Sequence, residues 1–214
     1  LNVKIGATHA GISVGEDGAT HQCCEDIALM RTIPGMVVIS PSDDTEARAA
    51  VKAAIDYKGP VYLRFGRLAV PVFNDPATYH FEMGKGVTLR EGGDLTIIAN
   101  GLMVWESLKA AEELEKSGVS ARVINIHTIK PLDAEIVRKA AAETGKILTV
   151  EEHNVIGGLG SAVCDEVCAS GIPCRVAKIG VQDVYGHSGP AADLLREFGL
   201  CADNIVSQAK ALLG

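Results

Sequence analysis

The chain has 214 residues, of which 47% are hydrophobic and 4% aromatic, and its formal net charge is −7. This acidic balance argues against a broad nucleic-acid-binding surface, because phosphate binding depends on clustered Lys and Arg. No apolar run approaches the ~20 residues of a membrane span, and the N-terminus lacks the layout of a signal peptide. The six cysteines form no CxxC pair. We therefore expect reduced structural thiols and a cytoplasmic protein.

Short β-branched runs alternate with amphipathic stretches over the first 65 residues, which is typical of βα units around a mostly parallel sheet. The pattern predicts strands at 3–8, 36–40 and 61–65, and helices at 21–32 and about 43–57. The second helix has the clearest start, because Ser42 or Asp43 caps it and Glu46 takes the capping-box position. Since Leu1 leads directly into a strand, the first unit is expected to be incomplete at its N-terminus.

A second βα series follows residues 66–94, a stretch with Pro71, Pro76 and little periodicity that indicates a linker with a short hairpin. The expected elements are strands at 95–100, 121–126, 146–151 and 174–179, and helices at 103–117, 133–144, 158–169, 190–198 and 202–213. The predicted fold class is α/β, with two three-layer α/β/α units whose sheets are mostly parallel. Their boundaries are placed at 1–68 for the truncated first unit, 69–93 for the linker and 94–214 for the second unit.

The densest polar cluster runs from Thr8 to Gln22 and lies between a strand end and a helix start, where open α/β sheets bind ligands. Its three glycines permit close backbone approach, and its histidines titrate near neutral pH. An ordinary polar loop, with His21 as a helix cap, is the alternative interpretation.

The string from His9 to Gln22, which ends Gly-Glu-Asp-Gly-Ala-Thr-His-Gln, resembles the signature of the transketolase family. The resemblance continues through Glu25–Ala28, Arg31–Pro34, Val38–Asp43 and Gly59–Leu63 to Arg67. It implies that residues 1–68 are the second half of a pyrimidine-binding domain and 94–214 a transketolase C-terminal domain. The form of the string is most similar to transketolases split into N- and C-terminal subunits. Deoxyxylulose-phosphate synthases and the β subunits of 2-oxoacid dehydrogenases share parts of it.

The resemblance implies roles for four residues in a transferase that moves a two-carbon ketol unit between sugar phosphates. His9 matches a substrate-binding histidine near the cofactor's reactive carbon, and His21 matches one that contacts the oxygen of the transferred unit. Both are predicted catalytic residues. Asp17 matches an acid that hydrogen-bonds a donor-sugar hydroxyl, and Arg67 an arginine that binds the sugar phosphate. Ala10 departs from the family pattern, which often has an acid there, so the sugar preference stays open.

The same resemblance implies thiamine diphosphate with magnesium as cofactor, bound mostly outside this chain. The glutamate that activates the cofactor and the aromatic residues around its ring precede Leu1 in the family, and the diphosphate-binding Gly-Asp-Gly motif does not occur here. We therefore predict no cofactor-binding or metal-binding residue in this chain, and no activity without an N-terminal transketolase subunit or domain. Homo-oligomers are also expected. A non-catalytic dimerisation or regulatory module and a dinucleotide-binding oxidoreductase are the competing hypotheses.

Three further features favour structural roles. The Gly157–Gly160 turn precedes a helix, but the neighbouring Glu151 and Glu152 would repel a phosphate, and the resemblance places the turn far from the chemistry. Arg64 is expected to pair with an acid, and His187 to be a surface-loop histidine before a helix with Pro190 at its first position.

Overall fold

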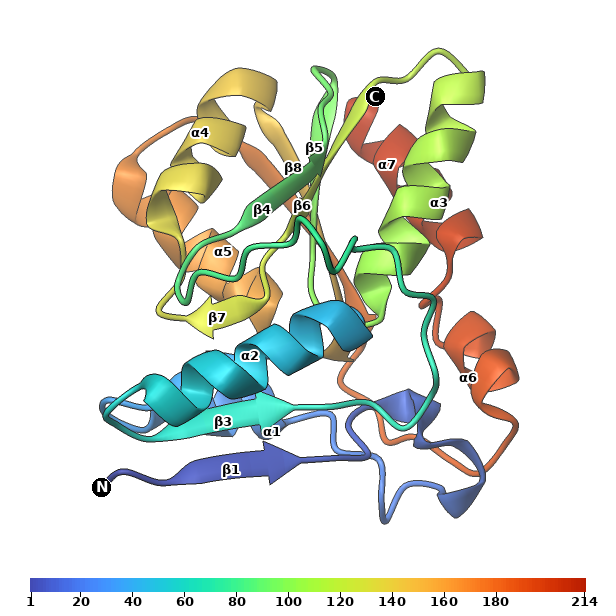
Figure 1. Cartoon of the computed structure of the whole chain (residues 1–214). Coiled ribbons are helices and arrows are strands. Elements are labelled where there is room, and N and C mark those ends of the chain that lie inside the picture. The colour runs from blue at the N-terminus through green and yellow to red at the C-terminus, as the bar shows by residue number, and fades with distance from the viewer.

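Two β-sheets organise the chain in the computed structural model, which describes all residues 1–214 (Figure 1). The first sheet has the order β1-β3-β2-β7 and the second the order β4-β6-β5-β8-β9. The strands of the first sheet are β1 (Lys4–Ala7), β2 (Val37–Ile39), β3 (Val61–Arg64) and β7 (Thr128–Lys130). Those of the second are β4 (Val87–Arg90), β5 (Leu95–Ala99), β6 (Ala121–Asn125), β8 (Lys146–Asn154) and β9 (Arg175–Val181). All pairings are parallel except those of β7 and β4. The expected class of two mostly parallel α/β units is confirmed.

Helices cover both faces of the second sheet (Figure 1). One face carries α3 (Met103–Lys116) and α7 (Ala202–Leu213), and the other carries α4 (Ala134–Thr144) and α5 (Leu159–Ser170). Adjacent residues of β5 serve opposite faces, since Ile97 belongs to the core under α3 and Ile98 to the core under α4. Burial on both faces explains the continuous apolar runs of these strands. The short α6 (Ala191–Glu197) packs against the first unit's glycine-rich loop.

The first sheet lies between α1 (Asp26–Thr32) and α2 (Asp44–Asp56). Asp43 caps α2 by accepting the Glu46 backbone N–H at 2.9 Å, and the Glu46 carboxylate accepts the Ser42 N–H at 2.6 Å. This confirms the helix start predicted from the capping pattern. Ala50 and Ala54 face the sheet, so the helix packs closely on the strands.

The first helix begins later than predicted, at Asp26 rather than near His21. A 3₁₀ helix, η1 (Ile12–Asp17), occupies the preceding loop. Gly11, Gly15 and Gly18 have φ angles of 79°, 83° and 75°, a left-handed backbone that interrupts regular helix. The predicted helix is shorter than expected because Cys23 instead forms a bridge with Ala10 and its carbonyl accepts the Gly11 N–H at 2.9 Å.

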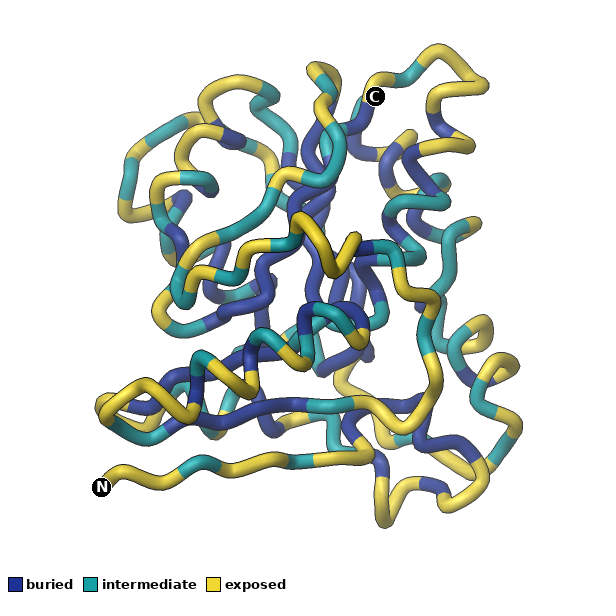
Figure 2. The backbone as a smooth tube through the Cα atoms, viewed as in Figure 1, coloured by how far each residue is buried: buried dark blue, intermediate teal, exposed yellow.

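Strands β4 and β7 are also absent from the predicted elements. Strand β4 lies inside the stretch expected to be a linker, where it pairs with β6 instead of forming a local hairpin. Strand β7 follows directly on the second unit's β6 but joins the first sheet, with Thr128 opposite Ile39 and Lys130 opposite Val38. The second unit thus covers one edge of the first sheet. The other edge, β1, is largely exposed (Figure 2). None of the helices has both the length and the apolar character needed to cross a lipid bilayer.

Candidate functional site

The glycine-rich loop starts at the carboxyl end of β1 and is fixed by its buried half. Residues 10–15 are buried, and the Gly11 N–H donates to the Cys23 carbonyl at 2.9 Å. Ile12 is fully buried in the core of the second unit, next to strands β5 and β8. The following residues His21, Asp17 and Glu16 are exposed. The loop therefore presents polar side chains to solvent from an anchored backbone.

Asp17 and Arg67 lie together at the surface. Arg67 Nη1 is 2.8 Å from Asp17 Oδ2 and donates to the Val14 carbonyl at 2.7 Å. The two side chains are 41% and 43% exposed. Arg67 comes from the segment just after β3, so the ends of two neighbouring strands supply this pair. An ion pair this exposed is weakly held, because solvent screens the two charges.

The two candidate histidines are exposed but form no contact with that pair. His9 Nδ1 lies 2.9 Å from Thr8 Oγ1, and His21 Nδ1 lies 2.9 Å from Thr20 Oγ1. His9 has a φ of 66°, a left-handed conformation that costs a non-glycine residue about 1–3 kcal/mol. Such strain is common at ligand-binding positions. The structure thus joins two of the four predicted site residues and leaves both imidazoles open at Nε2.

A buried ion pair between Arg64 and Asp26 lies next to the end of the loop. Arg64 Nε lies 2.8 Å from Asp26 Oδ2, both side chains are about 95% buried, and Tyr62 donates to the same oxygen at 2.8 Å. Burial raises the pKa of Asp26, but the Arg64 charge and these hydrogen bonds outweigh it and hold that pKa below its usual value. Arg64 also donates to the Glu152 carbonyl at 2.9 Å. The prediction that Arg64 pairs with an acid is confirmed.

Glu152, from the second unit, holds the 3₁₀ turn. Its fully buried carboxylate accepts the Ser13 N–H at 2.6 Å. A Cβ at Gly11 would overlap this carboxylate, so glycine is required there by packing as well as by φ. Burial raises the pKa of Glu152. Strand β8, which leads to the Gly157–Gly160 turn, therefore contacts the candidate loop.

The neighbouring Glu151 has a different task. It accepts the N–H groups of Leu159 at 2.6 Å and Gly160 at 2.8 Å, at the start of α5. The helix N-terminus is thus occupied by the chain's own carboxylate. Burial raises the pKa of Glu151 to about 7, although these N–H groups act in the opposite direction. The structural role predicted for this turn is confirmed.

The segment from 183 to 190 flanks the loop on its other side. Gln22 Nε2 donates to the His187 carbonyl at 2.9 Å and to the Ile12 carbonyl at 3.2 Å. Gly18 packs so closely on Ser188 that a Cβ would overlap the hydroxyl. His187 is exposed, as predicted, and the hydrogen bond that its Nε2 donates to the Glu197 carboxylate raises its pKa. Pro190 is the N-cap of α6, so the helix starts one residue later than predicted.

No group of three His, Cys, Asp or Glu side chains is placed to hold a metal ion. The exposed imidazoles, carboxylate and guanidinium suit hydroxyl and phosphate groups of a sugar. They do not form a site for a metal-bound diphosphate, so no residue of this chain is assigned to a cofactor.

These features define a protein of two α/β units. A polar loop lies at the carboxyl end of the mostly parallel first sheet, and hydrogen bonds from the second unit hold this loop in place. The chain belongs to the transketolase family. Residues 1–72 match the family described as the transketolase pyrimidine binding domain, and residues 84–205 match the transketolase C-terminal domain.

Individual relatives agree with this assignment. The putative transketolase C-terminal section of Methanocaldococcus jannaschii is 47% identical over 97% of this chain and 65% of the relative. The 6-deoxy-6-sulfo-D-fructose transketolase subunit SqwH of a Clostridium species is 44% identical over 98% of this chain and 64% of the relative. A solved split-gene transketolase, described as an inactive beta4 tetramer, has a TM-score of 0.89 and 45% identity over 100% of this chain and 67% of that one. The chain therefore spans about 65% of the length of these curated relatives.

Proposed function

We propose that this chain is the C-terminal portion of a thiamine-diphosphate-dependent transketolase that transfers a two-carbon ketol unit between sugar phosphates. The main support is the Asp17–Arg67 pair, 2.8 Å apart and half-exposed on the loop at the strand ends, in a chain similar to transketolase C-terminal sections. Thiamine diphosphate would supply the electron sink when bound in the complete enzyme. We assign it, with its magnesium, to an N-terminal partner and to segments outside this chain.

Each predicted residue acts on the sugar in this proposal. Arg67 leaves Asp17 and binds the sugar phosphate with its permanently charged guanidinium. Asp17 then accepts a hydrogen bond from a donor-sugar hydroxyl. His9 and His21, whose Nε2 atoms have no protein partner, bind oxygens of the sugar and transfer protons to and from them. We keep the division into 1–68, 69–93 and 94–214, a cytoplasmic location and homo-oligomeric assembly as predictions.

The test is reconstitution with the N-terminal partner. We expect no ketol transfer by the chain alone and transfer by the assembled enzyme loaded with thiamine diphosphate and magnesium. In that enzyme, Arg67→Ala should raise KM for phosphorylated sugars by roughly 10- to 100-fold, the loss of one charged hydrogen bond worth about 1.5–3 kcal/mol. Asp17→Ala should reduce discrimination between donor sugars.

Arg48→Ala is the matched control, because Arg48 forms an equally short but more exposed ion pair with Asp44 on α2. Its KM should not change. If the Arg67→Ala enzyme has the control's kinetics, the site assignment is wrong. If the assembled enzyme makes deoxyxylulose phosphate from pyruvate, the chain is part of a deoxyxylulose-phosphate synthase instead. If it makes no product at all, the chain is a non-catalytic dimerisation or regulatory module.

A further inference from the structure

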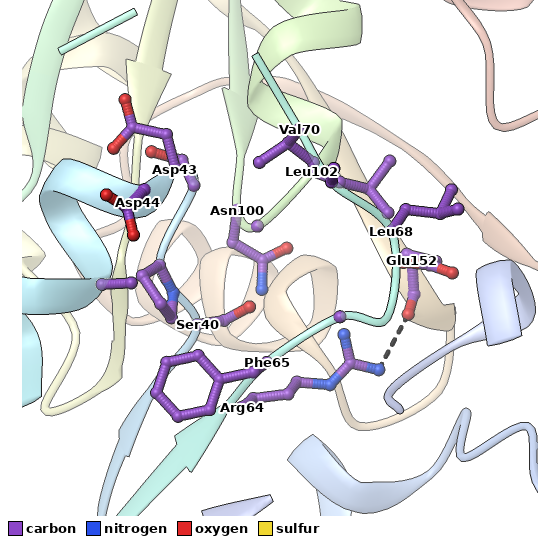
Figure 3. A pocket seen from close by; sticks show the side chains of 16 residues that line it. Ser40, Asp43, Asp44, Arg64, Phe65, Leu68, Val70, Asn100, Leu102 and Glu152 are labelled. Atoms are coloured by element: carbon purple, nitrogen blue, oxygen red, sulfur yellow. Dashed lines mark hydrogen bonds between the residues drawn. The ribbon is translucent and has the colours of Figure 1, made fainter. Parts of the chain in front are cut away.

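A cavity of about 410 Å³ lies where the two units meet, and none of His9, Asp17, His21 and Arg67 lines it (Figure 3). Its volume is in the range of small-molecule sites. It is lined from the first unit by residues such as Ser40 and Phe65, which directly follow β2 and β3, and from the second by Asn100 and Glu152. Strands of both sheets therefore direct their carboxyl ends towards one space.

The topology of the second sheet favours ligand binding at this place. After β5 the chain continues through β6 on one side of β5, and later returns through β8 on its other side. The order of strands thus reverses between β5 and β8. Open α/β sheets bind ligands outside the carboxyl ends of the strands at such a switch point. Asn100 directly follows β5, and Glu152 lies in the last part of β8.

Two polar groups at the cavity lack protein partners. Asn100 is 2% exposed, and its Oδ1 accepts no hydrogen bond. Arg64 uses Nε for Asp26 and Nη2 for the Cys23 and Glu152 carbonyls, which leaves Nη1 without a partner. Figure 3 shows the Asn100 amide and this end of Arg64 directed towards the same space. Buried polar atoms of native proteins are nearly always hydrogen-bonded, so Asn100 Oδ1 calls for a donor on a ligand. Arg64 Nη1 can donate to an acceptor on the same ligand.

The apolar and charged residues that line the cavity narrow the class of ligand that it can bind. Phe65, Leu68 and Leu102 add apolar side chains to the lining, which a flat ring could contact. Asp44 adds an acidic residue to the lining, and the Arg64 charge is already neutralised by Asp26. An anion would meet net repulsion, whereas an uncharged molecule would not.

We propose that this cavity binds an uncharged nucleobase or nucleoside of the adenine type. The base lies against Phe65 and Leu102, its amino group donates to Asn100 Oδ1, and its adjacent ring nitrogen accepts from Asn100 Nδ2. This two-point pairing is the one that asparagine makes with adenine elsewhere. Arg64 Nη1 donates to a further acceptor on the ligand. The proposal goes beyond ketol transfer and does not depend on it.

Calorimetric titration of adenosine into the 214-residue chain tests the proposal. We expect saturable binding. Inosine has a carbonyl in place of the amino group, so it should bind at least roughly tenfold more weakly, as for loss of a bidentate pair. AMP should also bind more weakly than adenosine, because its phosphate adds negative charge.

Variants locate the site. Asn100→Leu should weaken adenosine binding roughly tenfold or more. Asn74→Leu is the matched control, since Asn74 is also buried with an unpartnered amide nitrogen but does not line the cavity. Leu68→Trp fills the cavity from a side chain that is 38% exposed, so it should abolish binding without unfolding the chain. Thermal melts check that each variant folds, and Leu68→Trp decides whether the cavity is the site if Asn100→Leu does not fold.

Four outcomes would each overturn the proposal. They are no binding of adenosine at millimolar concentration, equal binding of inosine and adenosine, tighter binding of AMP than of adenosine, and unchanged adenosine binding by the cavity variants.

Discussion

Two arginine–aspartate pairs support the glycine-rich loop at the same N–O distance of 2.8 Å, and they differ in burial. Arg64–Asp26 is almost fully buried, whereas Arg67–Asp17 is about two-fifths exposed. Removing one partner of a buried pair leaves an uncompensated charge in the interior, which costs about 3–5 kcal/mol. An exposed pair contributes about 0–1 kcal/mol. The role proposed for Arg67 requires this division, because Arg67 must leave its aspartate to bind a sugar phosphate, whereas Arg64 keeps its bond to Asp26.

Asp26→Asn should therefore reduce the free energy of unfolding by about 3–5 kcal/mol, and Asp17→Asn by less than about 1 kcal/mol. Urea denaturation of both variants and the wild type measures the difference. Because the Asp26 side chain is isosteric with Asn, a large loss reports the charge and not a cavity. Equal losses in the two variants would contradict the structural assignment of Arg64.

Some of these residues were predictable from the sequence, and others were not. The Asp43–Glu46 cap is local, with partners three residues apart, and its pattern is visible in the sequence. Glu152 contacts Ser13 across 139 residues, and Gln22 contacts His187 across 165. No local periodicity encodes such contacts. The only signal was the spacing of glycines at 11 and 18, whose missing side chains make room for Glu152 and Ser188.

Among the helices and strands, the length of each element and its backbone conformation determined whether it could be predicted from the sequence. The longer helices α2, α3 and α7 carry several turns of amphipathic pattern, and their predicted bounds agree closely with the structure. Strand β7 has three residues, too few for a period-two pattern to be distinguished, and its partner β2 belongs to the first unit. η1 is held by left-handed glycines and by Glu152, neither of which hydrophobic periodicity reports.

The packing of η1 gives a prediction for Gly11. Gly11→Ala places a methyl group on a left-handed backbone and against the Glu152 carboxylate. Gly35 is the matched control, because its φ of 72° is similar and no atom lies within 4 Å of an added Cβ. Gly35→Ala should cost about 1–2 kcal/mol for the backbone alone. Gly11→Ala should cost more, as measured by urea denaturation.

A second substitution separates the two causes at Gly11. Glu152→Ala removes the overlapping carboxylate, so the cost of Gly11→Ala should be smaller in the Glu152→Ala background than in the wild type. Additive effects would show that Glu152 does not hold the loop, since residues in contact couple and independent ones add.

For the whole molecule, the two units share a core. One cluster contains Ile27, Val38 and Tyr62 from the first unit together with Ile129 and Val163 from the second. Strand β7 adds backbone hydrogen bonds across the same joint. The units should therefore unfold together rather than in sequence.

Ile129→Ala tests this joint. Ile129 is 1% exposed, so the substitution should reduce the free energy of unfolding by about 2–5 kcal/mol, and a single transition should remain. Ile5→Ala, in the exposed edge strand β1 of the same sheet, is the control and should cost much less because Ile5 is 37% exposed. Fluorescence of Trp105, in the second unit, and far-ultraviolet circular dichroism should give the same midpoint. Two separate midpoints would mean that the joint does not couple the units.

His127 makes this joint sensitive to pH. It is fully buried between β6 and β7, its ring centroid lies 4.3 Å from that of Phe81, and its carbonyl accepts the Ser40 N–H at 2.8 Å. Burial lowers the pKa of His127, although the carboxylates of Glu46 and Asp133 act in the opposite direction. The unfolded chain, in which the pKa is near 6.5, therefore binds this proton more readily. The stability that neutral His127 contributes is fully present above pH 6.5 and is lost as pH falls towards its folded-state pKa.

Other buried groups titrate in the same range, because burial lowers the pKa of His153 and raises that of Glu151 to about 7. A difference between variants isolates His127. Relative to the wild type, His127→Gln should gain stability as pH falls below 6.5, by at most about 1.4 kcal/mol per pH unit. His80→Gln, at an exposed histidine, is the control variant. Urea denaturation from pH 5 to 8 measures all three proteins, and a His127→Gln curve parallel to the wild type would mean that folding does not shift the His127 proton equilibrium.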